Sequence, residues 1–488
     1  MNSGNVYQND EVNPERTGEI SDRGVMNRKL LCLGICIAAV LCGCGKESPK
    51  ANVTLKEMSK YEHNVTRQND PSQGGTAEPV VDSEGFTVTD DTVYVMSNTL
   101  NVRTQPKPDA DQLQAVPYGT KLHRTGIGPN GWDRVYFDNT TAYVSNDQIT
   151  ELRIQDNRSF EYSNAMLSIV DTSRQNYSYD SMCKDLTEMR ERYGSAMKLN
   201  VIGTTRDDRS IFEIVIGDTS KAKKHIFFCG GMCGAEYMSS LLCMKQAEYY
   251  LCYYETGNYN GFAYKDLCDN AAIHIVPMLN PDSVMLSQEY LSGTDNPAII
   301  ADLKRWFERD RVNGGTSLSL ENYLMFFYAN ANGTDLRKNF PYQWDKIDAA
   351  AAEPASTGYR GSEPGCEPES VALIRQLTGT KPDLVVAYHT TGATVTYNYG
   401  QSEPLLSEAK SIAKSVATIM NYGVKDTNAG IAGYGSYEGY CNVERGIPAL
   451  SIALGNGSTP LALNEFIAIW TSCRQSWAVM QLAVINKR

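Results

Sequence analysis

The sequence has little histidine, little positive charge and no repeated motif. Five of its 488 residues are histidine, and 45 lysines and arginines stand against 57 aspartates and glutamates, a net charge of −12 with neutral histidines. Because a nucleic-acid-binding protein needs a cationic face, this balance argues against nucleic acid as the main partner. The missing repeat excludes solenoids and propellers. Hydrophobic residues make up 42% of the chain, enough for packed cores, and the length allows about two to four domains.

Cysteine is present, but not in the spacing of a zinc knuckle. Thirteen cysteines occur, four of them in one apolar stretch near the N-terminus. The other nine contain no Cys-x-x-Cys pair, which argues against a zinc knuckle or a thioredoxin-type redox site among them. We interpret most of these nine as small, buried side chains.

Residues 26–44 have the pattern of a lipoprotein signal peptide. Arg28 and Lys29 precede an apolar run from Leu30 to Cys42, which is shorter than the ~20 residues of a membrane span and typical of a signal core. The last residues, Leu-Cys-Gly-Cys, resemble a bacterial lipobox, which implies that Cys44 receives the lipid. The pattern predicts a protein anchored to the bacterial cell membrane on its extracellular face, with the membrane as a partner through the lipid.

The residues on either side of this signal are polar. Because signal peptides begin near the N-terminus, we interpret residues 1–25 as an over-extended start and Met26 as the true one. Residues 45–90 are rich in Ser, Pro, Gly and charge, and we expect a flexible linker there.

Residues 91–152 predict a small β-barrel. Short β-rich runs alternate there with turn residues. The segment resembles the bacterial SH3 family through Leu100-Asn101-Val102-Arg103, Gly131-Trp132 and Ala142-Tyr143-Val144. That resemblance implies a cell-wall peptide as ligand, and the alternative is a spacer module without a ligand.

Residues 176–488 predict an α/β domain. Apolar runs bounded by breakers predict buried strands, and amphipathic stretches between them predict helices. This alternation is typical of a three-layer domain with helices on both faces of a sheet. The predicted strands are 211–217, 225–229, 272–277, 384–388 and 449–454, and the predicted helices are 238–254, 367–378, 405–420 and 461–483, with a further helix capped by Asp180.

Three polar side chains follow the ends of these predicted strands. Cys233 and Glu236 come after the run that ends in Gly230-Gly231, and His389 ends the strand after Val386. Ligands on such sheets bind at the carboxyl ends of strands, and Cys, Glu and His together can hold zinc with one open position. Taken alone, the spacing equally allows Cys233 to be a buried thiol and His389 a packed side chain.

The domain resembles the zinc carboxypeptidase family, which includes enzymes that trim wall peptides containing D-glutamate and diaminopimelate. Four landmarks match the family's motifs in order: 230–236 (GGMCGAE), 277–282 (PMLNPD), 333–341 (GTDLRKNFP) and Tyr388-His389 with Gly392. The resemblance implies a carboxypeptidase-like α/β fold with a mixed sheet, a zinc ion and activity on peptides.

Several family positions carry other residues here. Cys233 stands at the first zinc histidine, while Glu236 and His389 match the other two ligands. Ala453 stands at the general-base glutamate, and alanine cannot accept a proton. Arg337 and Lys338 replace the Asn-Arg pair that grips the substrate carboxylate, and Lys keeps the charge without the fork. Tyr328 aligns with the arginine that stabilises the oxyanion.

We therefore expect a degenerate member that binds wall peptide, or another peptide, with little or no hydrolysis, and in which one zinc ion is possible but not required. The alternative is an active zinc carboxypeptidase that cleaves peptidoglycan stem peptides, for which Glu438, Glu444 or Glu465 would have to supply the base. A third hypothesis is a non-catalytic interaction scaffold. In a degenerate site, we expect Glu236 to pair with Lys338 or Arg337. We interpret His225 and His274 as structural.

Overall fold

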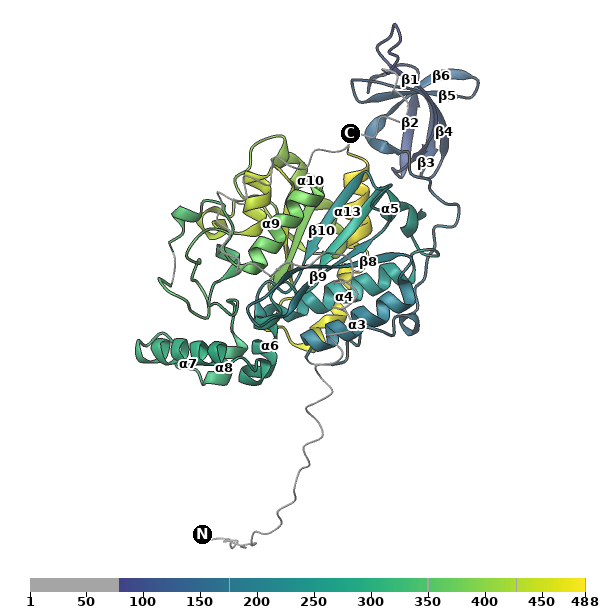
Figure 1. The fold of residues 1–488 in the computed structure, drawn as a ribbon. Helices are drawn as coiled ribbons and strands as arrows, with labels where there is room; N and C mark the ends of the chain where they lie inside the picture. Colours follow the sequence, from purple (N-terminus) through teal and green to yellow (C-terminus); the bar gives the residue numbers. More distant parts are fainter. Residues whose placement is uncertain (1–78, 175, 349–350, 427, 488) are drawn as a thin grey trace, which may run out of the picture. The chain divides into compact units, whose positions relative to one another are not determined.

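The computed structural model describes residues 79–174, 176–348, 351–426 and 428–487 (Figure 1). The predictions for 1–25, for the signal peptide with Cys44, and for most of the linker lie outside these residues. Within the described ranges, no helix is both long enough and apolar enough to cross a membrane.

The first folded unit is the predicted small β-structure. Its seven strands form one antiparallel sheet in the order β3-β2-β6-β5-β4-β1-β7. Alternate side chains of the strands, such as Val93 and Val95, are fully buried in a small core. The first strand begins ahead of the predicted boundary at residue 91. The strands are β1 (Thr87–Val95), β2 (Thr99–Arg103), β3 (Gln112–Pro117), β4 (Lys121–Ile127), β5 (Trp132–Phe137), β6 (Thr140–Ser145) and β7 (Ile149–Thr150).

The larger domain is built on an eight-stranded mixed sheet in the order β16-β15-β17-β14-β10-β13-β9-β8. Neighbours from β13 through β10 and β14 to β17 run parallel, as do β15 and β16. The pairs β8–β9, β9–β13 and β15–β17 are antiparallel. The sheet confirms the predicted α/β fold. Its strands are β8 (Met197–Thr204), β9 (Ser210–Ile216), β10 (Lys224–Cys229), β13 (Ala271–Val276), β14 (Leu384–Thr390), β15 (Thr394–Thr396), β16 (Gly423–Lys425) and β17 (Ala449–Leu454).

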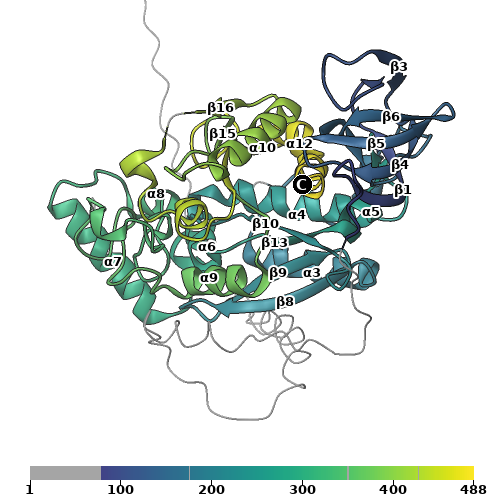
Figure 2. The same ribbon diagram turned by 90° about the horizontal axis from the view of Figure 1, so that it is seen from above.

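Helices cover both faces of this sheet, and Figure 2 shows α4 and α9 on opposite sides of it. On one face Phe228 stacks on Trp477 of α13, and on the other Phe227 and Val385 join an apolar cluster with Leu373 of α9. The alternating β10 side chains therefore divide between two cores. The helices are α3 (Tyr179–Tyr193), α4 (Tyr237–Cys252), α5 (Tyr264–Asn270), α6 (Pro281–Glu289), α7 (Pro297–Val312), α8 (Leu320–Met325), α9 (Pro368–Thr380), α10 (Leu405–Met420), α11 (Tyr437–Gly439), α12 (Phe466–Cys473) and α13 (Ser476–Ile485).

Two local predictions were wrong. The helix predicted over 461–483 is two helices, α12 and α13, because the chain turns between Cys473 and Ser476. The cap of α3 is Ser178, whose hydroxyl accepts from Ser181 N at 3.2 Å, while Asp180 lies in the first turn. Both residue types suit a helix start, and only the backbone geometry decides between them.

Candidate functional site

The candidate site begins in the turn that follows β10. Gly231 has a φ of +60°, and a Cβ there would lie 2.4 Å from Ser240 Oγ, so only glycine fits. Ser239 Oγ accepts from Gly231 N at 2.8 Å and donates to Glu236 O at 2.7 Å. These bonds fix the short turn η3 (Gly234–Glu236) and direct the Glu236 side chain toward the end of β14.

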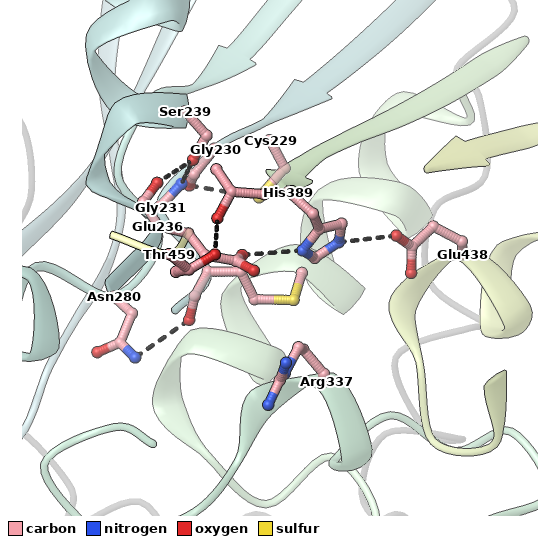
Figure 3. Close-up of polar contacts among 12 residues, drawn as sticks. Cys229, Gly230, Gly231, Glu236, Ser239, Asn280, Arg337, His389, Glu438 and Thr459 are labelled. Atoms are coloured by element: carbon pink, nitrogen blue, oxygen red, sulfur yellow. Dashed lines mark hydrogen bonds and ion pairs between the residues drawn. The ribbon is translucent and has the colours of Figure 1, made fainter. Parts of the chain in front are cut away.

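The centre of the site is one histidine between two carboxylates (Figure 3). His389 Nδ1 lies 3.0 Å from Glu236 Oε2, and His389 Nε2 lies 2.9 Å from Glu438 Oε1. The side chains of Glu236 and Glu438 are only 2% and 4% exposed. Burial opposes a charge on the imidazole, but the two carboxylates raise the pKa of His389 to about 10. The geometry thus favours an imidazolium between two carboxylates.

Cys233 is fully buried beside this group. Burial raises the pKa of its thiol well above the ordinary value, and the charge of Glu236 adds to the effect. Metal ligation needs the thiolate, and without a bound cation the environment of Cys233 favours the neutral thiol.

The two residues of the predicted Arg337-Lys338 pair lie in different environments. Arg337 Nε and Nη2 donate to Asp335 Oδ1 and Oδ2 at 2.9 and 2.8 Å, and the guanidinium lies 4.6 Å from the centre of the Tyr328 ring. Lys338 is partly exposed and has no ion pair among the described residues. Glu236 pairs with His389, not with Arg337 or Lys338, so the pairing expected for it was wrong.

The position predicted for the general base holds a methyl group next to His389. Ala453 of β17 pairs with His389 in the parallel ladder. Of the three glutamates considered as substitutes, Glu444 is exposed, and Glu465 accepts from the backbone N–H groups of Asn456 and Gly457. Only Glu438 contacts His389.

The donor set does not fit a three-ligand zinc site. Within the described part of the chain, no group of three His, Cys, Asp or Glu side chains is arranged to hold a metal ion. Two of the three predicted ligands, Glu236 and His389, face each other through a hydrogen bond, and Cys233 does not complete the set. We therefore derive no step through a metal.

A second histidine cluster lies on the same face of the sheet. His274 Nδ1 is 2.9 Å from Glu213 Oε1, and His274 Nε2 is 3.1 Å from His225 Nδ1. Glu213 Oε2 also accepts from the side-chain amides of Asn200 and Gln376 at 2.8 and 3.2 Å. Burial and the neighbouring His274 lower the pKa of His225. In the sequence, His225 and His274 are each a single histidine inside a predicted strand. Nothing in the sequence indicates that the two contact each other.

Two family models match the chain. Residues 182–456, more than half of the 488, match the model described as zinc carboxypeptidase. Residues 98–150 match the model described as bacterial SH3 domain. Both matches fall within the two folded regions predicted from the sequence.

Among known proteins, the chain is similar to a gamma-D-glutamyl-L-diamino acid endopeptidase 1 of Lysinibacillus sphaericus, with 25% identity over 301 residues, 61% of this chain and 70% of that protein. It is 27% identical over 278 residues to the uncharacterized protein YqgT of Bacillus subtilis strain 168, which covers 56% of this chain and 68% of that protein. The crystal structure of a carboxypeptidase A from Helicoverpa armigera aligns with a TM-score of 0.47 at 14% identity, over 82% of this chain and 98% of that one.

Proposed function

The chain belongs to the zinc carboxypeptidase family, and from this membership we propose that its site binds peptides, in particular cell-wall peptides, and hydrolyses them little or not at all. The observation that carries the proposal is the pairing of Ala453 with His389, which leaves a methyl group at the position of the family's base. A peptidase needs a Lewis acid, a proton acceptor and an anion stabiliser acting together.

The two acids that are present support binding rather than hydrolysis. Both Glu236 and Glu438 already form hydrogen bonds with His389, so each carboxylate has an oxygen that contacts the imidazole instead of a water molecule. Glu438 bonds to the ring nitrogen opposite the one that faces Glu236. Glu438 therefore orients the imidazole ring. Because it lies across the ring from Glu236, it does not hold a water molecule on the Glu236 side of the site.

Cell-wall peptide as the ligand class is supported by two likenesses. One relative is named for its action on gamma-D-glutamyl-L-diamino acid bonds, and the chain carries a bacterial SH3 domain. With the lipobox at Cys44, these features fit a lipid-anchored protein on the extracellular face of a bacterial membrane. Lys338, which has no ion pair among the residues that the structure describes, is the cation that we expect to bind the terminal carboxylate of such a peptide.

Calorimetry and mass spectrometry on the full-length protein test the proposal. A synthetic peptide containing γ-linked D-glutamate and diaminopimelate is titrated into the protein, and the same mixtures are analysed for cleavage products. We expect binding, no cleavage, and a loss of affinity in Lys338→Ala. Lys346→Ala is the matched control, because Lys346 is an exposed lysine eight residues further along.

Two other outcomes would each point to one of the remaining functions. Turnover that is lost in Glu438→Gln would contradict the proposal and favour an active hydrolase in which Glu438 supplies the base. Absence of both binding and cleavage would contradict it in favour of an interaction scaffold.

A further inference from the structure

The candidate site contains a cation, Arg337, whose guanidinium is held by a buried aspartate. Arg337 is the first of two basic residues in the short turn η5 (Leu336–Lys338), and its partner Asp335 is completely buried. The carboxylate of Asp335 also accepts from Thr357 Oγ1 and from Gly358 N, each at 3.1 Å. With one side held in this way and Tyr328 stacked against its face, the guanidinium has a defined position.

Part of this guanidinium remains available. Asp335 uses Nε and Nη2, and no hydrogen bond of Nη1 is found among the described residues. The Arg337 side chain is 35% exposed, so the two N–H groups of Nη1 can reach a ligand oxygen.

The charge of Arg337 acts on the same groups that would otherwise hold a metal. Figure 3 shows Arg337 in the group that contains Glu236 and His389. Burial opposes the charge of Arg337, but the carboxylates of Asp335 and Glu236 raise its pKa well above the ordinary value. A metal ion entering the site would meet this fixed positive charge and, in addition, the imidazole already bonded to both carboxylates.

We propose that Arg337 supplies the positive charge of this site in place of a metal ion, so that a carbonyl or carboxylate oxygen of the peptide binds to the guanidinium without zinc. The inference rests on the proposed function for the identity of the ligand. Its metal-independence can be measured on the protein alone. Removing the guanidinium is expected to make the site a better cation binder, an effect that a purely structural arginine would not produce.

The first experiment uses zinc chloride as the only probe. Zinc is titrated into the full-length protein and into Arg337→Gln, with Arg360→Gln as control because Arg360 also stacks on a ring, that of Trp344, at 4.0 Å. We expect zinc binding to wild type and to the control to be weaker than about 1 µM, and zinc binding to Arg337→Gln to tighten at least about tenfold. One-to-one zinc binding to wild type tighter than this, lost in Glu236→Gln, would overturn the inference, as would an unchanged zinc affinity in folded Arg337→Gln.

The second experiment uses the peptide, first with the wild-type protein and then with one variant. Wild-type protein is titrated with the same wall peptide in the presence of EDTA and then in excess zinc. Equal affinities within about twofold support the inference. Binding that EDTA abolishes and zinc restores would overturn it, while leaving binding without hydrolysis in place. If no peptide binds under either condition, the proposed function fails and the zinc titrations still decide the inference.

Arg337→Lys, which keeps the charge but not the fork, is expected to bind peptide at least about tenfold more weakly than wild type.

Discussion

The two histidine clusters use the same chemical groups and reach opposite electrostatic states. Both lie on the face of the sheet that carries the apolar cluster of Phe227 and Val385. At one end, two carboxylates share one imidazole and favour its charged form. At the other, one carboxylate faces His274, and His274 faces His225. That carboxylate also accepts from two side-chain amides, and burial together with His274 lowers the pKa of His225. Two carboxylates outweigh burial at His389, whereas burial and a second imidazole prevail at His225, so the surroundings of each histidine set the direction of its pKa.

Removing the imidazole should separate the two clusters most strongly. His389→Ala leaves Glu236 and Glu438 buried without a cation, and we expect a loss of about 3–5 kcal/mol in the free energy of unfolding. His274→Ala leaves Glu213 with the amides of Asn200 and Gln376, for an expected loss of about 1–3 kcal/mol. Urea unfolding at pH 7 measures both, and equal losses would break the comparison.

The pH dependence of stability should run in opposite directions. His389 has a folded pKa of about 10, above its ordinary 6.5, so its contribution is complete below pH 6.5 and is lost as the pH rises toward 10. His225 has a lowered folded pKa, so stability is lost as the pH falls below 6.5, where the unfolded chain takes up the proton. Unfolding from pH 5 to 10 is compared for wild type, His389→Gln and His225→Gln. His389→Gln should remove only the loss of stability at high pH, and His225→Gln only the loss at low pH. A variant that removes both losses would contradict the assignment.

A buried carboxyl without an imidazole provides a smaller contrast. Glu369 is fully buried, and burial together with the charge of Glu367 raises its pKa to about 8. Because the folded pKa is raised, this group costs stability progressively as the pH rises from 4.5 to 8. We expect Glu369→Gln to stabilise the protein by about 1–3 kcal/mol at pH 8 and to have little effect at pH 4.5. Destabilisation at pH 8 would show that the carboxyl is paired in its ionised form.

The smallest effect on stability is expected for Lys338, which follows Arg337 in η5. Lys338 has no ion pair among the described residues, so Lys338→Ala should change the free energy of unfolding by less than about 0.5 kcal/mol. Its wall-peptide affinity should nevertheless fall at least about tenfold. Thermal unfolding and calorimetry on the same preparation test both parts, with Lys346→Ala as control. A large loss of stability would mean that Lys338 belongs to the buried network.

Most of the fold could be predicted from the sequence, because buried strands leave a local signal. The run Ala449–Leu454 coincides with β17, and Leu405–Met420 coincides with α10. The break between α12 and α13 was missed because residues 461–483 contain no glycine or proline to mark it. Apolar composition reports burial and does not report where a helix axis changes direction.

The candidate site was predictable only where its residues belong to local motifs. Glu236 and His389 stand next to strand ends, which placed them near each other. The contact between His389 and Glu438 joins residues 49 positions apart, and it depends on how α11 packs beside β14. The contact between His225 and His274 requires the register of β10 on β13, in which His274 lies opposite Phe227. Pairings of this kind are properties of the assembled sheet.

The pair formed by Asp335 and Arg337 has one further consequence. Asp335 Oδ1 accepts both from the backbone N–H of Arg337, at 3.2 Å, and from its guanidinium, at 2.9 Å. The guanidinium is thus held by a contact within a single turn, between residues two positions apart. The strands of the sheet take no part in this contact. One or two codon changes in this turn could install or remove the cation without redesigning the scaffold.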